Sequence, residues 1–149
     1  RDVAPSRGLG DVYKRQFEIY ATNHDIHVMD FVLKLDAYSY YMMNLLDYLI
    51  GNTDRHWGNW GFLVDNRTNQ PVRLFDLMDL NQTFLAYDTP DGANCMTTGN
   101  RKMSQREAAV EAVKNIGLNQ KDEIKDEWFK GREKEREMFW CRFGILKEQ

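Results

Sequence analysis

The sequence predicts an α+β protein that is mainly α-helical and contains one β-hairpin. An apolar stripe of helical period over residues 30–50 is followed by a loop and by two short β-prone runs at 62–64 and 72–75. Helical patterns return after residue 104. The chain has 149 residues, of which 42% are hydrophobic, so it can bury a core of useful size. We therefore expect one globular unit and not a disordered chain.

Charge and cysteine content narrow the classes of partner. The chain carries 20 Lys and Arg against 23 Asp and Glu, a formal net charge of -3, so it offers no dense cationic surface and direct nucleic-acid binding is not expected. We recognise no signal peptide and no apolar run of membrane-spanning length, so no membrane association is expected. Two cysteines, Cys95 and Cys141, have no metal-ligand spacing. These features favour a reducing, bacterial-type cytoplasm.

The first sixteen residues call for separate treatment. Ser6 to Gln16 (SRGLGDVYKRQ) reads like the translated end of a transposase adaptor from sequencing-library preparation. We expect residues 1–16 to be such an artefact and to be disordered, with the native reading frame beginning near Phe17. Residues 17–149 are then expected to be a C-terminal piece of a longer protein.

The first helix is expected to run from Asp30 to about Ile50, because its apolar residues alternate spacings of four and three. Gly51 is expected to end it. The stripe predicted to face the core consists of Phe31, Leu35, Tyr38, Met42, Leu45 and Leu49.

A polar, glycine-containing loop over residues 51–61 follows this helix and leads into the predicted hairpin. Its turn is expected at 65–70, where Asn and Asp are frequent. Since the second strand ends on the side of the loop, we expect Asp54, Asn59 and Asp79 to converge.

These three side chains are of the types that phosphoryl transfer uses. Magnesium prefers oxygen ligands, and a carboxylate can orient the attacking hydroxyl. In protein kinases the catalytic-loop aspartate precedes a metal-binding asparagine by five positions, and Asp54 and Asn59 have the same separation.

The segment Gly51-Asn52-Thr53-Asp54-Arg55-His56 resembles the catalytic loop of the HipA-like serine/threonine kinases. Its Asp-Arg-His-x-x-Asn order is also similar to that of phosphoinositide kinases. The resemblance covers residues 45–90 well and implies a protein-kinase-like C-lobe, whose one hairpin carries the catalytic and metal-binding loops. It implies that Asp54 is the catalytic base, that His56 supports the catalytic loop, and that Asn59 and Asp79 bind Mg²⁺ and, with it, ATP.

Two aspartates compete for the role of the kinase DFG aspartate. Asp76 and Asp79 are three positions apart, and the family pattern places this residue five positions after a leucine that closes the second strand. Leu74 and Asp79 have that separation, so Asp79 is favoured. Leu80-Asn81 stands where Phe-Gly follows in eukaryotic kinases, which puts DFG-style switching in doubt.

The family likeness further favours a protein Ser or Thr hydroxyl as the phosphate acceptor, the chain's own included, and leaves lipids and small molecules open as acceptors. Some members of the family are toxins neutralised by a partner protein, so an antitoxin-type partner is also an expectation. The β-rich lobe that supplies a lysine and a glycine-rich cover for ATP is expected to be missing here, and the fragment by itself is therefore expected to be nearly inactive.

Two alternative functions stay open at this point. The chain could be a non-catalytic, kinase-like interaction or regulatory module. It could also be a metal-dependent phosphohydrolase that uses Asp54, His56 and Asp79 as ligands.

Three other residues of the loop are expected to have structural roles. Trp57 and Trp60 are expected to pack and not to bind ligand. For Arg55, a surface ion pair or a hydrogen bond within the loop is favoured over pairing with an activating phosphate.

Beyond Phe84, the sequence up to Asn100 lacks periodicity, and we expect a mobile loop. Ser104 and Glu107 then form a capping box, which predicts a helix that ends at Gly117. Its expected apolar face is Ala109, Val110, Val113 and Ile116.

Two more helices are predicted after it. Asn119 is expected to cap one that carries Ile124 and Trp128. The charged run 130–137 is expected to be a solvated face of the last helix. The apolar residues of that helix are Met138, Cys141, Phe143, Ile145 and Leu146.

Overall fold

The computed structural model describes residues 28–56, 59–65, 67–85, 87–97, 103–118 and 122–149. The elements in chain order are α2 (Val28–Ile50), β1 (Phe62–Asp65), β2 (Gln70–Leu74), α3 (Gln105–Ile116), the 3-10 helix η1 (Asp126–Phe129) and α4 (Glu133–Lys147). The predicted α+β class is therefore confirmed. The expectations for residues 1–16, for Phe17, for Trp57 and for the Asn119 cap lie outside the described residues.

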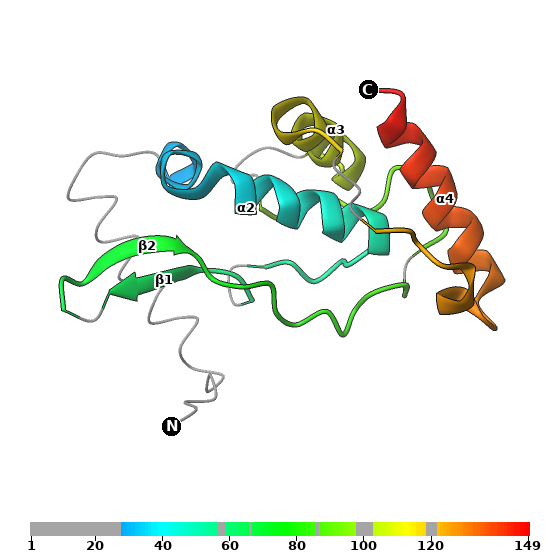
Figure 1. The fold of residues 1–149 in the computed structure, drawn as a ribbon, viewed down its shortest axis with the longest axis horizontal. Coiled ribbons are helices and arrows are strands. Elements are labelled where there is room, and N and C mark those ends of the chain that lie inside the picture. Colours follow the sequence, from blue (N-terminus) through cyan, green and yellow to red (C-terminus); the bar gives the residue numbers. More distant parts are fainter. Residues whose placement is uncertain (1–27, 57–58, 66, 86, 98–102, 119–121) are drawn as a thin grey trace.

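The long helix α2 is the centre of the fold. Figure 1 shows it crossing the molecule, with the β1–β2 hairpin along one side, α3 along the other and α4 beside its C-terminal end. The core gathers around α2. The part of the chain that the structure describes includes no helix both long and apolar enough to cross a membrane.

Helix α2 is kinked at Asp36, which has non-helical angles, φ -157° and ψ 67°, inside the helix. The predicted face is wrong at two positions, because Tyr38 is 56% exposed and Met42 is 36% exposed. Leu45 and Leu49 of the same predicted stripe are buried. The second half of the helix also buries Tyr40, Tyr41, Met43 and Tyr48, which lie outside that stripe.

The predicted hairpin is confirmed. β1 and β2 pair antiparallel, with Phe62 opposite Leu74 and a register irregularity between Leu63 and Val64. The turn is closed by the Asp65 carbonyl, which accepts the N–H of Asn69 at 2.8 Å. Because the strands are antiparallel, the chain that follows Leu74 returns to the end of the hairpin where the loop after α2 enters it (Figure 1).

Helix α3 has the predicted ends. The Ser104 side chain accepts the N–H of Glu107, and the Glu107 carboxylate accepts the N–H of Ser104 at 2.8 Å, which is the reciprocal capping box. Gly117 follows the last turn at φ 73°. The helix packs against α2 through a face that includes the buried Ala109 and Ala112.

The segment between Phe84 and α3 has no helix or strand among its described residues beyond one bridge from Asn94 to Ser104. It is nevertheless attached to α2, because the Tyr48 hydroxyl donates to the Pro90 carbonyl at 2.7 Å and the Thr97 hydroxyl donates to Asn44 at 2.5 Å. The mobility expected for this loop stays a prediction.

The C-terminal part differs from the expected pair of full helices. Among the described residues 122–132, the one-turn η1 is the helical element, and Trp128, expected on a full helix, is 60% exposed. Phe129 is the buried residue of η1 and packs near Phe139 of α4. Cys141 is exposed where an apolar face was expected. The residues that α4 buries are Phe139, Arg142, Phe143 and Leu146.

Candidate catalytic loop and metal-binding residues

The loop begins with a sharp turn at the end of α2. Gly51 adopts φ +62°, a conformation that favours glycine. The Asn52 N–H then donates to the Asp47 carbonyl at 2.9 Å, which ends the helix as predicted. The Asn52 side chain is fully buried, and its amide donates to the Asp47 carboxylate at 2.9 Å. The start of the loop is thereby fixed to the last turns of α2.

Asp54 lies at the solvent-facing side of the loop, with its side chain 42% exposed. Its N–H donates to the Asn52 side-chain oxygen at 3.3 Å, and its carbonyl accepts the N–H of His56 at 2.9 Å. The Nε2 of His56 is 3.6 Å from Asp54 Oδ1, and the His56 side chain is itself 53% exposed. A carboxylate held in this way can be reached by a hydroxyl from solvent.

Asn59 is buried below Asp54, with 2% of its surface exposed. Its side-chain Nδ2 donates to the Asp54 carbonyl, which joins the two residues that the five-residue spacing singled out. Its Oδ1 is buried and has no hydrogen-bond partner among the described residues. A buried amide oxygen without a partner is costly, so this atom is a candidate ligand for a cation.

Arg55 connects this loop to the segment that carries the second aspartate. Its Nη1 donates to the Asn59 carbonyl at 2.9 Å and to the Met78 carbonyl at 2.8 Å. The Met78 carbonyl belongs to the peptide bond that leads into Asp79. The favoured loop hydrogen bonds of Arg55 are thus present, but the residue is 3% exposed and does not form a surface ion pair. The backbones of Asn59 and Asp79 are brought together by one guanidinium.

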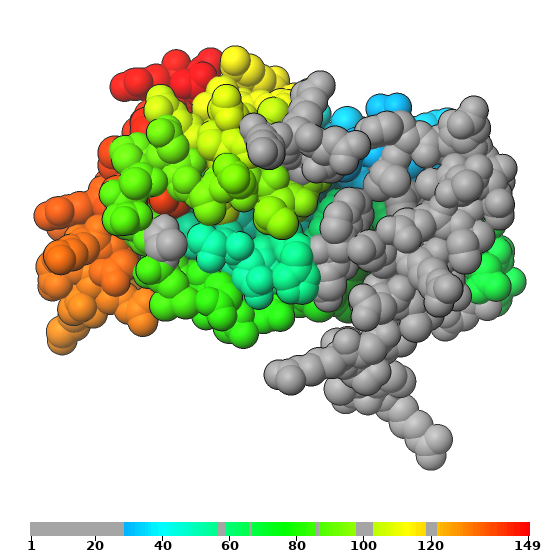
Figure 2. Space-filling model, turned by 180° about the vertical axis from the view of Figure 1, so that it is seen from behind, coloured from blue at the N-terminus to red at the C-terminus, as the bar shows by residue number. Residues whose placement is uncertain are grey.

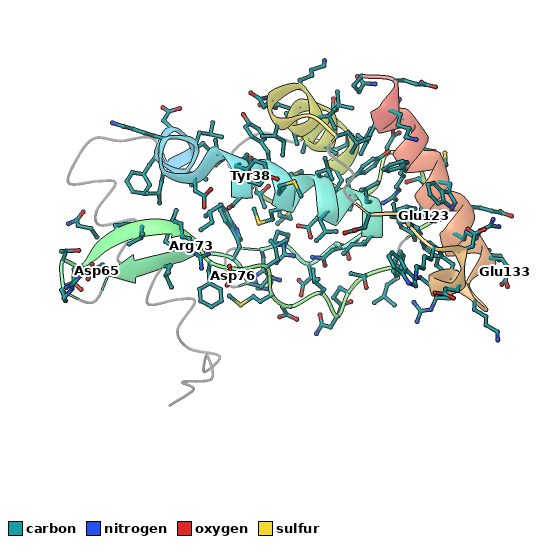
Figure 3. The ribbon with its side chains drawn as sticks, viewed as in Figure 1. Tyr38, Asp65, Arg73, Asp76, Glu123 and Glu133 are labelled. Carbon is teal, nitrogen blue, oxygen red and sulfur yellow. The ribbon has the colours of Figure 1, made fainter. Side chains whose placement is uncertain are left out.

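Asp79 itself is exposed and has φ 55°, which is uncommon for a residue other than glycine. Asp76 lies in a different setting. Its carboxylate is 2.8 Å from Arg73 Nη1, and the Asp76 side chain is 80% exposed. Figure 3 shows Arg73 and Asp76 close together where β2 ends. The Arg73 partner makes Asp76 the weaker candidate for a metal ligand.

The loop lies at one face of the molecule. Figure 2 shows the segment that follows α2, in teal, between the green segment that follows β2 and the yellow-green segment before α3. Trp60 is buried on the inner side and packs with Tyr40, so its expected packing role is confirmed. The loop therefore has a packed inner side and an outer side that carries Asp54 and His56.

The Asn59 amide oxygen and the Asp79 carboxylate are of the oxygen type that suits Mg²⁺. The link between them that the structure describes is the pair of hydrogen bonds from Arg55 to the Asn59 and Met78 carbonyls. By contrast, the described residues contain no group of three or more His, Cys, Asp or Glu that could hold a metal ion. Asp54, His56 and Asp79 therefore do not form the ligand cluster that the phosphohydrolase alternative uses.

Sequence reasoning missed two residues of this region, Asp47 and Asn52. Both are buried polar side chains, and both fix the loop to α2. The available signal was the polar pair Asn44 and Asp47 three positions apart on a helix face that is otherwise apolar.

Comparison of the chain with models of known protein families, with curated proteins and with solved structures found no match. The arrangement of the loop and of its neighbours is therefore the basis for a functional conclusion.

Proposed function

We propose that residues 51–84 are the catalytic and Mg²⁺-binding segment of an ATP-dependent, HipA-like kinase, and that residues 17–149 belong to its C-lobe, with the described residues in a protein-kinase-like arrangement. The acceptor in this proposal is a protein Ser or Thr hydroxyl, of another protein or of the chain itself. The observation that carries the proposal is the Asn59 side chain. Its Nδ2 donates to the Asp54 carbonyl, and its buried Oδ1 has no hydrogen-bond partner among the described residues.

In this proposal Asp54 is the general base. It accepts the proton of the acceptor hydroxyl as the oxygen of that hydroxyl forms a bond to the γ-phosphorus of ATP, and the bond from the γ-phosphorus to the ADP oxygen breaks. The partial exposure of Asp54 supports this role, because the acceptor must reach the carboxylate from solvent. His56 lies beside the same carboxylate.

Asn59 and Asp79 are the proposed metal ligands. When bound, Mg²⁺ supplies positive charge that neutralises the phosphate oxygens of ATP. Arg55 holds the backbones of the two ligands near each other through the carbonyls of Asn59 and Met78. The left-handed backbone at Asp79 also supports a functional role, since strained conformations cluster at active sites.

Binding of Mn²⁺ in place of Mg²⁺ tests the metal ligands directly. Mn²⁺ is titrated into the protein with and without ATP and followed by its paramagnetic resonance signal. We expect Asp79→Asn to weaken binding at least about tenfold. Asp76→Asn is the matched control. It removes the same charge at a position three residues from Asp79, and Asp76 is already paired with Arg73. This variant should bind Mn²⁺ like the wild type.

The outcomes separate the candidate functions. Equal Mn²⁺ binding by Asp79→Asn and the wild type would contradict the kinase proposal. Loss of Mn²⁺ binding in Asp76→Asn alone would identify Asp76, and not Asp79, as the metal ligand. Tight binding of Zn²⁺ or Mn²⁺ that is indifferent to ATP would favour a phosphohydrolase. A folded wild type that binds neither Mn²⁺ nor ATP would favour a non-catalytic module that interacts with a partner.

Phosphoryl transfer is a second test of the proposal. Labelled ATP and Mg²⁺ are supplied to a form of the protein that also contains a nucleotide-covering lobe, because transfer needs a lysine on the phosphates as well as the metal. Asp54→Ala should abolish transfer while ATP binding stays close to that of the wild type. Unchanged transfer in this variant would rule out Asp54 as the base.

A further inference from the structure

A buried ion pair lies beneath the proposed catalytic loop. The Arg55 side chain is 3% exposed and the Asp47 side chain is 5% exposed. Arg55 Nε donates to Asp47 Oδ2 at 2.8 Å, and Arg55 Nη2 donates to Oδ1 at 2.9 Å. The two groups therefore face each other in the bidentate geometry that fits a guanidinium to a carboxylate. Asn52 adds a third hydrogen bond to Asp47 Oδ1.

The remaining Nη1 group of the same guanidinium binds backbone carbonyls at and next to the proposed metal ligands. Arg55 Nη1 binds the carbonyls of Asn59 and Met78, as described above. A guanidinium is planar and rigid, so fixing one edge with a carboxylate fixes the direction in which the other edge donates. The orientation of Arg55, set by Asp47, consequently determines how the Asn59 backbone lies relative to that of Asp79.

Many kinases order the corresponding loops by phosphorylation, which supplies a phosphate that pairs with an arginine. Here the anion-binding edge of Arg55 is already occupied by Asp47, a carboxylate built into α2. An activating phosphate on this arginine would have to displace a buried and fully hydrogen-bonded partner. The loop thus has an internal counter-ion for Arg55.

We propose that Asp47 is a positioning residue for the metal site, and that it substitutes for an activating phosphate by holding Arg55 in its metal-competent orientation without any modification. This inference rests on the proposed function. Asp47 touches neither metal nor nucleotide in it, and acts only through Arg55. The unphosphorylated protein is therefore competent to bind the metal.

Chemical rescue provides a test that a merely structural role would not pass. Asp47→Ala leaves a carboxylate-sized space facing the Arg55 guanidinium. A small cavity already adjoins this position, and its lining includes Asp47 and Arg55 themselves together with Asn44, Asn52 and Gln105. Formate can occupy the space and restore the missing anion. The protein used is shown to be unphosphorylated by its intact mass.

Two readouts are measured on the wild type and on Asp47→Ala, in sodium formate and in sodium chloride of the same ionic strength. The first is Mn²⁺ affinity. The second is the hydrogen exchange of peptides that cover residues 53–60 and 76–82. We expect Asp47→Ala to bind Mn²⁺ at least about tenfold more weakly and to exchange faster in both peptides, and we expect formate to reverse both changes.

Two further variants keep the test decisive. Asp47→Asn keeps the shape and removes the charge, so it should show a smaller loss that formate does not reverse, because the space stays filled. If Asp47→Ala does not fold, the same two readouts on Asp47→Asn test the inference. Asp91→Ala is the matched control, since Asp91 forms a 3.1 Å ion pair with Arg106 whose two side chains are exposed, and it should change neither readout.

The inference is overturned if folded Asp47→Ala binds Mn²⁺ and exchanges like the wild type, if formate leaves its losses unchanged, or if Asp47→Asn is indistinguishable from the wild type in both readouts. Failure of the proposed function is recognised separately. If the wild type binds no Mn²⁺ but formate still slows exchange in Asp47→Ala, Asp47 orders the loop and the metal assignment is wrong.

Discussion

The carboxylate of Asp36 accepts the backbone N–H of Leu74 at 3.0 Å, which joins the kink of α2 to the end of β2. The same carboxylate accepts the N–H of Ser39 at 3.2 Å and so caps the second half of the helix. One side chain therefore explains why the helix can break its regular geometry at this point. It also attaches the hairpin that leads to Asp79.

Asp36→Ala should destabilise the protein, because two backbone N–H groups lose their acceptor. We expect the free energy of unfolding to fall by about 1–3 kcal/mol. Chemical denaturation followed by circular dichroism measures the change. Asp30→Asn is the control, since Asp30 is an exposed acidic residue in the first turn of the same helix, and a loss as large in this variant would contradict the assignment.

The same contact should make stability depend on acidic pH. Burial raises the pKa of Asp36, but the hydrogen bonds from Leu74 and Ser39 and the charge of Arg73 outweigh it, so the net pKa lies below the ordinary value of 3.8. A carboxyl whose pKa is lower in the folded state stabilises the fold above pH 3.8, and this contribution is lost as the pH falls through the folded pKa.

Denaturation of the wild type and of Asp36→Asn at a series of pH values tests this dependence. Asn cannot ionise, so the difference in stability between the two proteins should be largest at neutral pH and should shrink below pH 3.8. A difference that stays constant, or that grows on acidification, would show that the charge of Asp36 is not involved.

Gly51→Ala should destabilise the turn into the loop that follows α2. Gly51 has φ +62°, and an added Cβ would clash with the ring of Tyr87. The left-handed backbone alone costs an alanine about 1–2 kcal/mol, and the clash adds to it. Gly61→Ala is the control, because a Cβ there meets nothing within 4 Å, and its melting temperature should stay near that of the wild type. Equal melting temperatures for both variants would refute the argument.

Gly144→Ala should have the opposite effect. Gly144 lies inside α4, and a Cβ there meets no atom within 4 Å. Alanine loses less backbone entropy in a helix than glycine, so stability should rise by about 0.5–1 kcal/mol. Gly131→Ala is the contrast, since that position is equally open but has φ +76° and should lose stability. Thermal unfolding of the two variants gives the comparison.

Arg142 is fully buried and fastens α4 to the end of α2. Its guanidinium donates to the Tyr48 and Thr89 carbonyls and lies 4.3 Å from the ring centroid of Tyr87. Burial raises the pKa of Tyr48 to about 12, so this phenol is neutral beside the cation at physiological pH. The cation is held by carbonyl oxygens and by aromatic faces.

Arg142→Met should therefore lower the free energy of unfolding by at least about 2 kcal/mol, because both carbonyls lose their donor and the cation–π contact is removed. Arg136→Met, on the exposed side of α4, is the matched control and should behave like the wild type. A tolerated Arg142→Met would mean that apolar packing alone holds α4 in place.

Local signals in the sequence predicted much of the architecture. The end of α2 at Gly51, the hairpin turn that begins at Asp65 and the capping box of Ser104 and Glu107 each depend on residues within a few positions of one another. Such interactions are readable because the chain makes them whatever its distant parts do.

Expectations that depend on distant contacts were less successful. Tyr38 and Met42 are exposed although they share a helix face with the buried Leu45 and Leu49. The kink at Asp36 was not predicted either, and the backbone N–H that its carboxylate accepts belongs to Leu74, 38 positions away. Trp128 is exposed because the region forms one 3-10 turn in place of a helix, with Phe129 inward. Periodicity describes an undisturbed helix and cannot register a tertiary partner.

The sequence by itself determined which side chains are the proposed site residues, namely Asp54, Asn59 and Asp79, because their types and spacing are properties of the chain. Only the tertiary structure decided how they are held. The buried pair of Asp47 and Arg55 sets the relation between the loop and the segment after β2, because a desolvated guanidinium must find all of its acceptors within the fold, and no local pattern states which acceptors those are.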